Sequence, residues 1–89
     1  MRSHLTEDFV SRFEKLPPRI QRLARKNYKL WKKNPSHAGL QFKRVGKRKP
    51  VYSVRVGIGW RALGLKMDDV IVWFWIGSHA EYNELIVRL

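Results

Sequence analysis

The sequence predicts an α+β fold in which two helices are followed by four strands and a short final helix. Two observations support this order. Apolar residues recur every three or four positions up to residue 34, the period of a helix, and alternate with polar residues after Gly39, the period of a strand. The length of 89 residues suits one hydrophobic core and leaves too little chain for a second. We therefore expect a single domain over residues 1–89.

The two helices are predicted from residues that favour helix ends. Thr6 is a preferred N-cap residue, and two acidic residues follow it, where the helix dipole favours negative charge. Pro17-Pro18 ends this first helix, and its second proline suits the first position of the next helix, which should stop at Asn34-Pro35. The residues expected on the apolar faces are Phe9, Val10, Phe13 and Leu16 in the first helix, and Ile20, Leu23, Ala24, Tyr28 (or Asn27) and Trp31 in the second.

Four strands are predicted after the helices. Leu40–Val45 and Val51–Val56 alternate in polarity, as half-buried strands do. Trp60–Lys66 follows a connection at Gly57–Gly59, where glycine can supply a positive φ. Val70–Ile76 is apolar on both faces, which predicts the central strand of the sheet.

Both ends of the chain add a short element. Met1–Leu5 is long enough only for a stub of strand. Ser78 and Glu81 match a capping box, in which the two side chains bond each other's backbone N–H groups. A short helix should therefore start after Ser78 and run through Leu85.

The charge balance indicates a polyanionic partner. Lys and Arg number 19 against 7 Asp and Glu, which gives a net charge of +12. Hydrophobic residues make up 44% of the chain and aromatic residues 12%, so it is not a disordered basic tail. Nucleic acid, an acidic protein and an anionic membrane surface all fit this charge. An anionic membrane surface is the least favoured of these three partners, because the apolar faces of the helices are needed for the core.

The sequence excludes several classes of protein. It has no cysteine, so it has neither a disulfide framework nor a thiolate zinc site. It has no HxxxH pair and no glycine-rich phosphate loop, and we expect neither a metal nor a cofactor. The longest apolar stretch, Val70–Gly77, falls well short of the roughly 20 residues that span a bilayer. Met1–His4 leads into a polar segment unlike the core of a signal peptide, so we expect a cytoplasmic protein.

Two basic clusters are candidate nucleic-acid contacts. Seven Lys or Arg residues and no acidic residue occur from position 19 to position 33, whereas an ordinary surface mixes both signs. A solvated helix face is the plainer alternative. The predicted contacts are Arg19, Arg22, Lys26, Lys29 and Lys33 along one side of the second helix, widened by Arg25 and Lys32, and Lys43, Arg44, Lys47, Arg48 and Lys49 in and after the first full strand.

Four residues are candidates for RNA cleavage: Arg55, Arg61, His79 and Tyr82. A three-residue loop at Gly57–Gly59 would place the two arginines directly opposite each other, where they need an anion or a carboxylate between them. A two-residue loop would place them on opposite faces. Attack by the RNA's own 2′-hydroxyl requires a base, positive charge against the phosphate oxygens and an acid for the leaving oxygen. The four side chains meet these needs.

Each of these residues also has a structural interpretation. His79 could be a capping or hydrogen-bonded residue at a helix start, and Tyr82 could simply pack. The two arginines could pair with Glu81 or Glu84.

Four stretches share a pattern with a known protein family. They are Asn34–His37 together with Leu40–Lys43, then Tyr52–Val56, then Trp60–Leu63, and finally Trp73–Tyr82, which is the most specific. With the helical hairpin before them, they resemble the RelE/ParE superfamily of toxins from bacterial toxin–antitoxin modules.

The resemblance implies a small fold similar to microbial RNases, with the helical hairpin packed on a curved antiparallel sheet of about four strands. It implies an endoribonuclease that cuts mRNA in the ribosomal A site without a metal, and an acidic, partly disordered antitoxin as partner. By motif, Arg55 and Arg61 would stabilise charge on the phosphate and the transition state. His79 would act as general acid or base, and Tyr82 would orient or stack on the substrate.

Two positions depart from the family pattern. Ser53 stands where RelE has a lysine, and Lys43 on the neighbouring strand can substitute if its side chain points to the same side. Met1–Leu5 is shorter than the usual first strand, so we expect the sheet edge to be frayed or completed by a partner.

Two other functions stay open at this point. A ParE-like toxin would bind and inhibit DNA gyrase without a cleavage site. Members of that type generally lack the pair matched by His79 and Tyr82, which favours the nuclease. The third function is that of a basic RNA-binding domain without activity.

Overall fold

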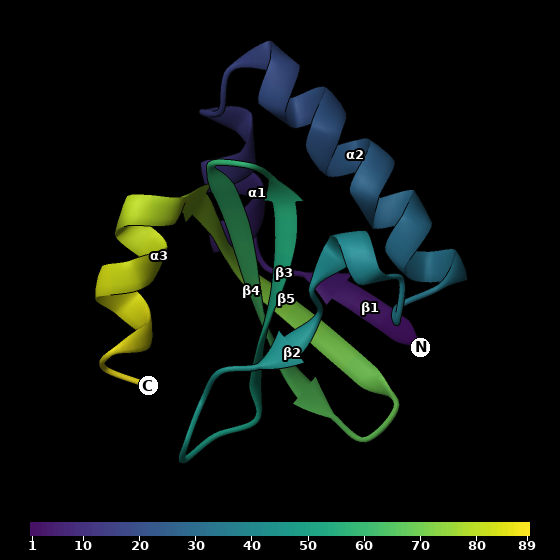
Figure 1. Ribbon diagram of the computed structural model, residues 1–89, viewed down its shortest axis with the longest axis vertical. Helices are drawn as coiled ribbons and strands as arrows, with labels where there is room; N and C mark the ends of the chain where they lie inside the picture. The colour runs from purple at the N-terminus through teal and green to yellow at the C-terminus, as the bar shows by residue number, and fades with distance from the viewer.

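The computed structural model describes residues 1–89 and contains a sheet with helices on both of its faces (Figure 1). The α+β class predicted from the sequence is confirmed. The elements in chain order are β1 (Arg2–Leu5), α1 (Glu7–Glu14), α2 (Pro18–Lys33), the 3₁₀ turn η1 (Ala38–Leu40), β2 (Lys43–Arg44), β3 (Val51–Gly57), β4 (Trp60–Met67), β5 (Val70–Ser78) and α3 (His79–Ile86).

The sheet has five strands in the order β1-β5-β4-β3-β2. Four of them are antiparallel, as the resemblance implies, whereas β1 pairs with β5 in parallel and makes the sheet mixed. The pairing is extended at both ends, because Arg2 N donates to Asp69 O and Thr6 N donates to Trp73 O. The stub expected at residues 1–5 is thus an ordered edge strand rather than a frayed one. It satisfies backbone groups that β5 would otherwise expose.

The strand expected over Leu40–Val45 is wrong in length. Only Lys43 and Arg44 form the strand β2, and Leu40 belongs to the turn η1. His37 caps that turn, its Nδ1 accepting from the backbone N–H of Gly39 at 3.1 Å. Gln41 then has a φ of 47°, a left-handed conformation that no strand can contain.

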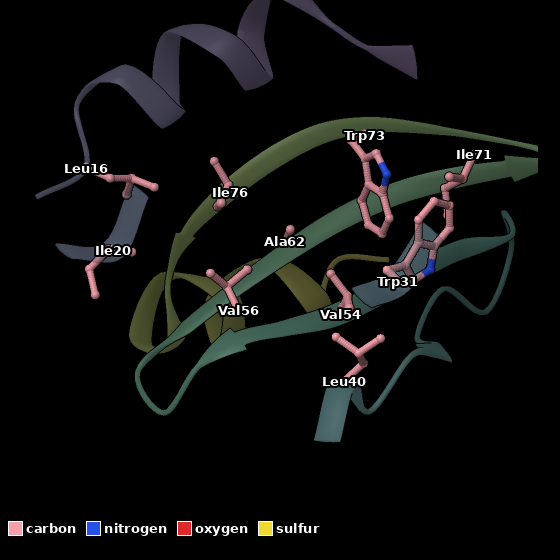
Figure 2. Close-up of a cluster of buried hydrophobic side chains, with 10 residues drawn as sticks. All are labelled: Leu16, Ile20, Trp31, Leu40, Val54, Val56, Ala62, Ile71, Trp73 and Ile76. Carbon is pink, nitrogen blue, oxygen red and sulfur yellow. The ribbon is translucent and has the colours of Figure 1, made fainter. Parts of the chain in front are cut away.

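Helices α1 and α2 cover one face of the sheet and form the main core with it (Figure 1). Figure 2 shows the buried side chains of this core. Within it, the rings of Trp31 and Trp73 meet edge to face at 5.4 Å and 76°. Val10, expected on the apolar face of the first helix, is instead 40% exposed. The buried residues of this core are Leu16, Ile20, Trp31, Leu40, Val54, Val56, Ala62, Ile71, Trp73 and Ile76.

Helix α3 lies on the opposite face of the sheet and closes a second, smaller core (Figure 1). Tyr82 of α3 packs there against Val51, Leu63 and Trp75. The predicted capping box is present, so the helix start is fixed directly after β5. None of the helices is both long and apolar enough to cross a membrane.

Candidate active site

The β3–β4 hairpin places the two candidate arginines opposite each other. Only Ile58 and Gly59 connect the strands, because Gly57 already pairs with Trp60. A regular hairpin of this length would put the arginines on opposite faces. A bulge between Arg55 and Gly57 adds one residue to β3 and restores the pair Arg55↔Arg61. The expected opposition is therefore confirmed, although it arises from a bulge rather than from a three-residue loop.

The turn itself does not use the conformational freedom of glycine. No glycine in the chain has a positive φ, so the role expected of the glycines at Gly57–Gly59 is wrong. The guanidinium of Arg61 holds the turn instead. Its Nη1 donates to Trp60 O at 2.8 Å and to Gly57 O at 3.0 Å.

Arg61 is a half-buried cation in a positively charged setting. Burial lowers the pKa of Arg61, and the charge of Arg55 lowers it further, while Tyr82 acts in the opposite direction. The hydrogen bonds of its Nη1 all go to backbone carbonyls and none to a carboxylate. Glu81 serves the capping box, where its Oε1 accepts from Ser78 Oγ at 3.0 Å. The arginine pair thus keeps its positive charge available to an anion from outside.

Strand register gathers the other candidates on the same sheet face. Lys43 lies directly opposite Ser53, so both share the face of Arg55, two residues further along β3. Arg61 lies opposite Gly77, which has no side chain to cover it. The expectation that Lys43 points to the same side as Ser53 is therefore confirmed.

Tyr82 is buried between α3 and this face of the sheet. Its side chain is 6% exposed, and its hydroxyl donates to Ser53 Oγ at 3.1 Å. Ser53 is itself only 2% exposed. Ser53 is thus the buried partner of the tyrosine hydroxyl. This geometry suits a supporting role for Tyr82 and leaves its ring unable to stack on a substrate.

His79 begins α3 next to the hairpin turn. Its backbone N–H donates to Gly59 O at 2.8 Å, which joins the helix start to the turn held by Arg61. Its ring lies 5.6 Å from the ring of Tyr82 at 51°, and its Nδ1 lies 3.1 Å from Nδ2 of Asn83. Tyr82 and Asn83 therefore fix the ring, and Nε2 remains as the nitrogen without a protein partner.

The two basic clusters lie on different parts of the molecule. All five residues of the predicted α2 stripe are exposed, and most of them line a shallow trough that Arg25 and Leu30 complete. Arg25 is anchored over the ring of Phe13 at 5.0 Å. In the second cluster, Lys43 belongs to the face of Arg55, whereas Arg44 points to the other side and donates from Nε to Gly46 O. Lys47, Arg48 and Lys49 are exposed in the loop before β3.

Sequence reasoning missed Ser53 and Asn83 as members of this site. Asn83 follows His79 by four residues, a spacing that brings side chains together on a helix and so could have indicated it. Ser53 and Tyr82 are 29 residues apart, and no local pattern signals their contact. No three His, Cys, Asp or Glu side chains group as metal ligands would.

Solved structures from several organisms share this fold. The toxin in the RelB–RelE antitoxin–toxin complex of Methanococcus jannaschii matches with a TM-score of 0.73 and 16% identity, over 92% of this chain and 96% of that one. YafQ from Escherichia coli matches with a TM-score of 0.73 and 15% identity, over 92% and 98%. The isolated RelE toxin of E. coli matches with a TM-score of 0.64 and 17% identity, over 98% and 96%. At these identities the likeness establishes the fold.

The sequence itself identifies the family. No curated protein sequence matches the chain. The family model described as a ParE-like toxin domain matches residues 18–84, which include α2 and every strand except β1. The resemblance to the RelE/ParE toxins is thereby confirmed, and the chain belongs to the ParE-like toxin domain family.

Proposed function

We propose that this toxin is a metal-independent endoribonuclease that cuts mRNA on the ribosome and so stops translation. The observation that carries the proposal is the pair Arg55↔Arg61, two cations directly opposed in the hairpin whose turn is bonded to the backbone of His79. Like charges in this arrangement repel, and a phosphate between them removes the repulsion. A sheet that keeps such a pair without a carboxylate partner is suited to an anionic ligand.

The chemistry needs the groups near this hairpin together with solvent water. The 2′-hydroxyl loses its proton to a base and attacks the adjacent phosphorus, which forms a 2′,3′-cyclic phosphate. The bond to the 5′-oxygen breaks, and that oxygen leaves with a proton from an acid. Arg55 and Arg61 stabilise the charge on the phosphorane oxygens, His79 transfers the proton at one of the two reacting oxygens, and solvent water takes or supplies the proton at the other. Lys43 provides the further positive charge that Ser53 cannot.

Ribosome dependence is supported by the distribution of charge. The trough is formed by exposed residues of α2, the helix that packs on one face of the sheet, whereas the arginine pair shares the other face with Ser53. One strand of mRNA in the active site would not also fill the trough. A second RNA surface is therefore expected, and ribosomal RNA is the polyanion present wherever mRNA is translated.

An acidic antitoxin is the expected protein partner. In the M. jannaschii structure, RelE is bound to the antitoxin RelB. A net charge of +12 favours an acidic, partly disordered chain that covers the basic surface, and electrostatic attraction would make its association fast. The mRNA, the ribosome and the antitoxin are all cytoplasmic, which is where we expect this protein to act.

The test is mRNA cleavage in a reconstituted translation extract, mapped by primer extension. Wild-type protein should cut inside codons only when ribosomes are present, and His79→Ala should lose the cuts. His37→Ala is the matched control, because His37 is exposed and only caps the turn η1. Intact mRNA at doses of wild-type protein that stop cell growth would overturn the proposal.

Inhibition of DNA gyrase is the second candidate function. The match to a ParE-like toxin domain favours it, as does the burial of Tyr82 away from the site surface. In this case His79→Ala would remain toxic, and purified protein would block gyrase supercoiling in vitro. Protein that binds RNA but neither cuts it nor blocks gyrase would be an inactive RNA-binding domain.

A further inference from the structure

The imidazole of His79 can act in RNA cleavage only from the nitrogen that faces outward. Nδ1 is directed at Asn83, and Nε2 has no protein partner. A neutral imidazole accepts a proton on Nε2 only when Nδ1 carries the hydrogen, and an imidazolium that donates from Nε2 carries a hydrogen on Nδ1 as well. His79 therefore needs a hydrogen on Nδ1 both as general base and as general acid.

Asn83 is the side chain that adjoins Nδ1. Its amide nitrogen Nδ2 lies 3.1 Å from Nδ1, and the residue occupies the position four after His79, on the same side of α3. Rotation of the amide by 180° exchanges its oxygen and nitrogen at this distance, because the two ends are nearly alike in size. With the oxygen toward the ring, the amide accepts from Nδ1–H and leaves Nε2 free.

The other groups around the imidazole of His79 hold the ring in place but do not determine which nitrogen carries the hydrogen. Tyr82 contacts the ring through its own ring, and its hydroxyl is directed at Ser53 instead of at the imidazole. The backbone N–H of His79 is bonded to the hairpin turn. Asn83 is therefore the group that selects which nitrogen carries the hydrogen.

We propose that Asn83 is the positioning residue of His79: its amide oxygen keeps the hydrogen on Nδ1 and makes Nε2 the nitrogen that exchanges protons with RNA. This inference rests on the nuclease proposed above and adds a residue to it. An asparagine bonded to a histidine performs the same task in cysteine proteases of the papain type.

Charged and titratable groups surround His79 on the sheet and on its own helix. From the sheet, Arg61 of β4 lies opposite Gly77, two residues before His79, and Arg55 of β3 lies opposite Arg61. From its own helix, the phenol of Tyr82 faces the ring and the carboxylate of Glu81 is engaged in the cap. Asn83→Asp would add a negative charge in contact with the ring, and a contact of this kind stabilises the imidazolium.

The first experiment uses nitrogen–proton NMR correlation of the histidine side chains in the free, full-length protein. Wild-type His79 in its neutral form should carry its hydrogen on Nδ1, and Asn83→Leu should shift it toward Nε2. Asn83→Asp should keep it on Nδ1 and move the protonation midpoint of the ring to higher pH. His4 and His37 serve as internal references that stay unchanged, and the exposure of Asn83 makes both variants compatible with the fold.

The second experiment measures mRNA cleavage by the same variants on programmed ribosomes. Asn83→Leu should lower the cleavage rate at saturation by about 10- to 100-fold, part of the 10²–10⁴ that general acid–base catalysis contributes, with KM unchanged. Asn83→Asp should retain activity, with its pH–rate profile displaced to higher pH. Glu84→Gln, exposed and adjacent, should match the wild type.

The two readouts separate failure of this inference from failure of the proposed function. The NMR result needs no RNA, so a shift of the hydrogen in Asn83→Leu supports the positioning role even if the protein does not cut mRNA. A wild-type His79 with its hydrogen on Nε2, or an Asn83→Leu ring identical to the wild type, would overturn the inference. Loss of cleavage in Asn83→Leu without that shift would also overturn it.

Discussion

Arg55 and Arg61 lie directly opposite each other on β3 and β4, and the bulge between Arg55 and Gly57 is what brings them there. Arg61 also bonds the carbonyls of the turn that it helps to enclose. Arg61 therefore both shapes the hairpin and contributes positive charge to the sheet face that it shares with Arg55. The arrangement is unfavourable in the empty protein and becomes favourable when an anion enters, which makes it testable through stability.

Replacement of Arg55 should stabilise the free protein. The lowered pKa of Arg61 means that the folded state binds the Arg61 proton less tightly than the unfolded chain does, so its charged form costs stability at every pH below the folded-state pKa. Arg55→Gln removes part of that cost and should raise the free energy of unfolding by about 0.2–1 kcal/mol in urea titrations at neutral pH. Inorganic phosphate should stabilise the wild type more than this variant. A variant less stable than the wild type would contradict this explanation, and Arg48→Gln in the exposed loop is the control.

The hydroxyls of Ser53 and Tyr82 should be energetically coupled. Tyr82→Phe leaves the buried Ser53 hydroxyl without its partner and should cost about 1–3 kcal/mol, whereas removal of both hydroxyls in Ser53→Ala/Tyr82→Phe should cost less than the sum of the single changes. Urea unfolding of the four proteins gives the coupling energy. Strictly additive effects would show that the hydrogen bond contributes nothing.

Glycines of the sheet should differ sharply in their tolerance of a methyl group. A Cβ at Gly64 would lie 2.7 Å from Ile71 Cγ1 and 2.8 Å from Trp73 Cε3, so Gly64→Ala should destabilise the core by about 1–3 kcal/mol. Nothing lies within 4 Å of a Cβ at Gly59, and its φ is not positive. Gly59→Ala should therefore be neutral or slightly stabilising when both variants are compared with the wild type by thermal unfolding. Equal losses for both would indicate that the packing around Gly64 can relax.

The basic trough of α2 should control how RNA binding depends on salt. Lys26 and Lys29 line the trough and are exposed. Each phosphate contact that they make adds about 0.7 to the slope of log affinity against log salt for single-stranded RNA. Lys26→Gln/Lys29→Gln should thus reduce the slope by about 1.4, measured by fluorescence anisotropy with an oligoribonucleotide. Lys15→Gln, at the exposed end of α1, should leave it unchanged, and an unchanged slope in the double variant would exclude the trough as an RNA contact.

Local signals in the sequence predicted the parts of the fold that local physics determines. The N-cap at Thr6, the stop at Pro17-Pro18 and the capping box of Ser78 with Glu81 all appear where expected, because each depends on residues at most three positions apart. The opposition of Arg55 and Arg61 was expected from a three-residue loop, whereas the structure reaches it through a bulge that the sequence did not indicate.

Local sequence signals could not predict contacts between residues that are far apart in the chain. The parallel pairing of β1 with β5 joins residues almost 70 positions apart, and a four-residue segment has no pattern that selects a partner. The loss of strand structure at Gln41 depends on a turn capped by His37. The buried hydroxyl of Tyr82 is bonded to Ser53. In the sequence, Ser53 was noted only because RelE has a lysine at that position.

The most direct test of the central claim is the chemistry at the ends of the cut mRNA. Translating ribosomes would be incubated with and without the protein, and the new ends mapped by ligation assays that distinguish a phosphate from a hydroxyl. Attack by the 2′-hydroxyl, assisted by Arg55, Arg61 and His79, predicts a 2′,3′-cyclic phosphate and a 5′-hydroxyl, both lost in His79→Ala. Ends with a 3′-hydroxyl and a 5′-phosphate, or cleavage that survives in His79→Ala, would contradict the proposed mechanism.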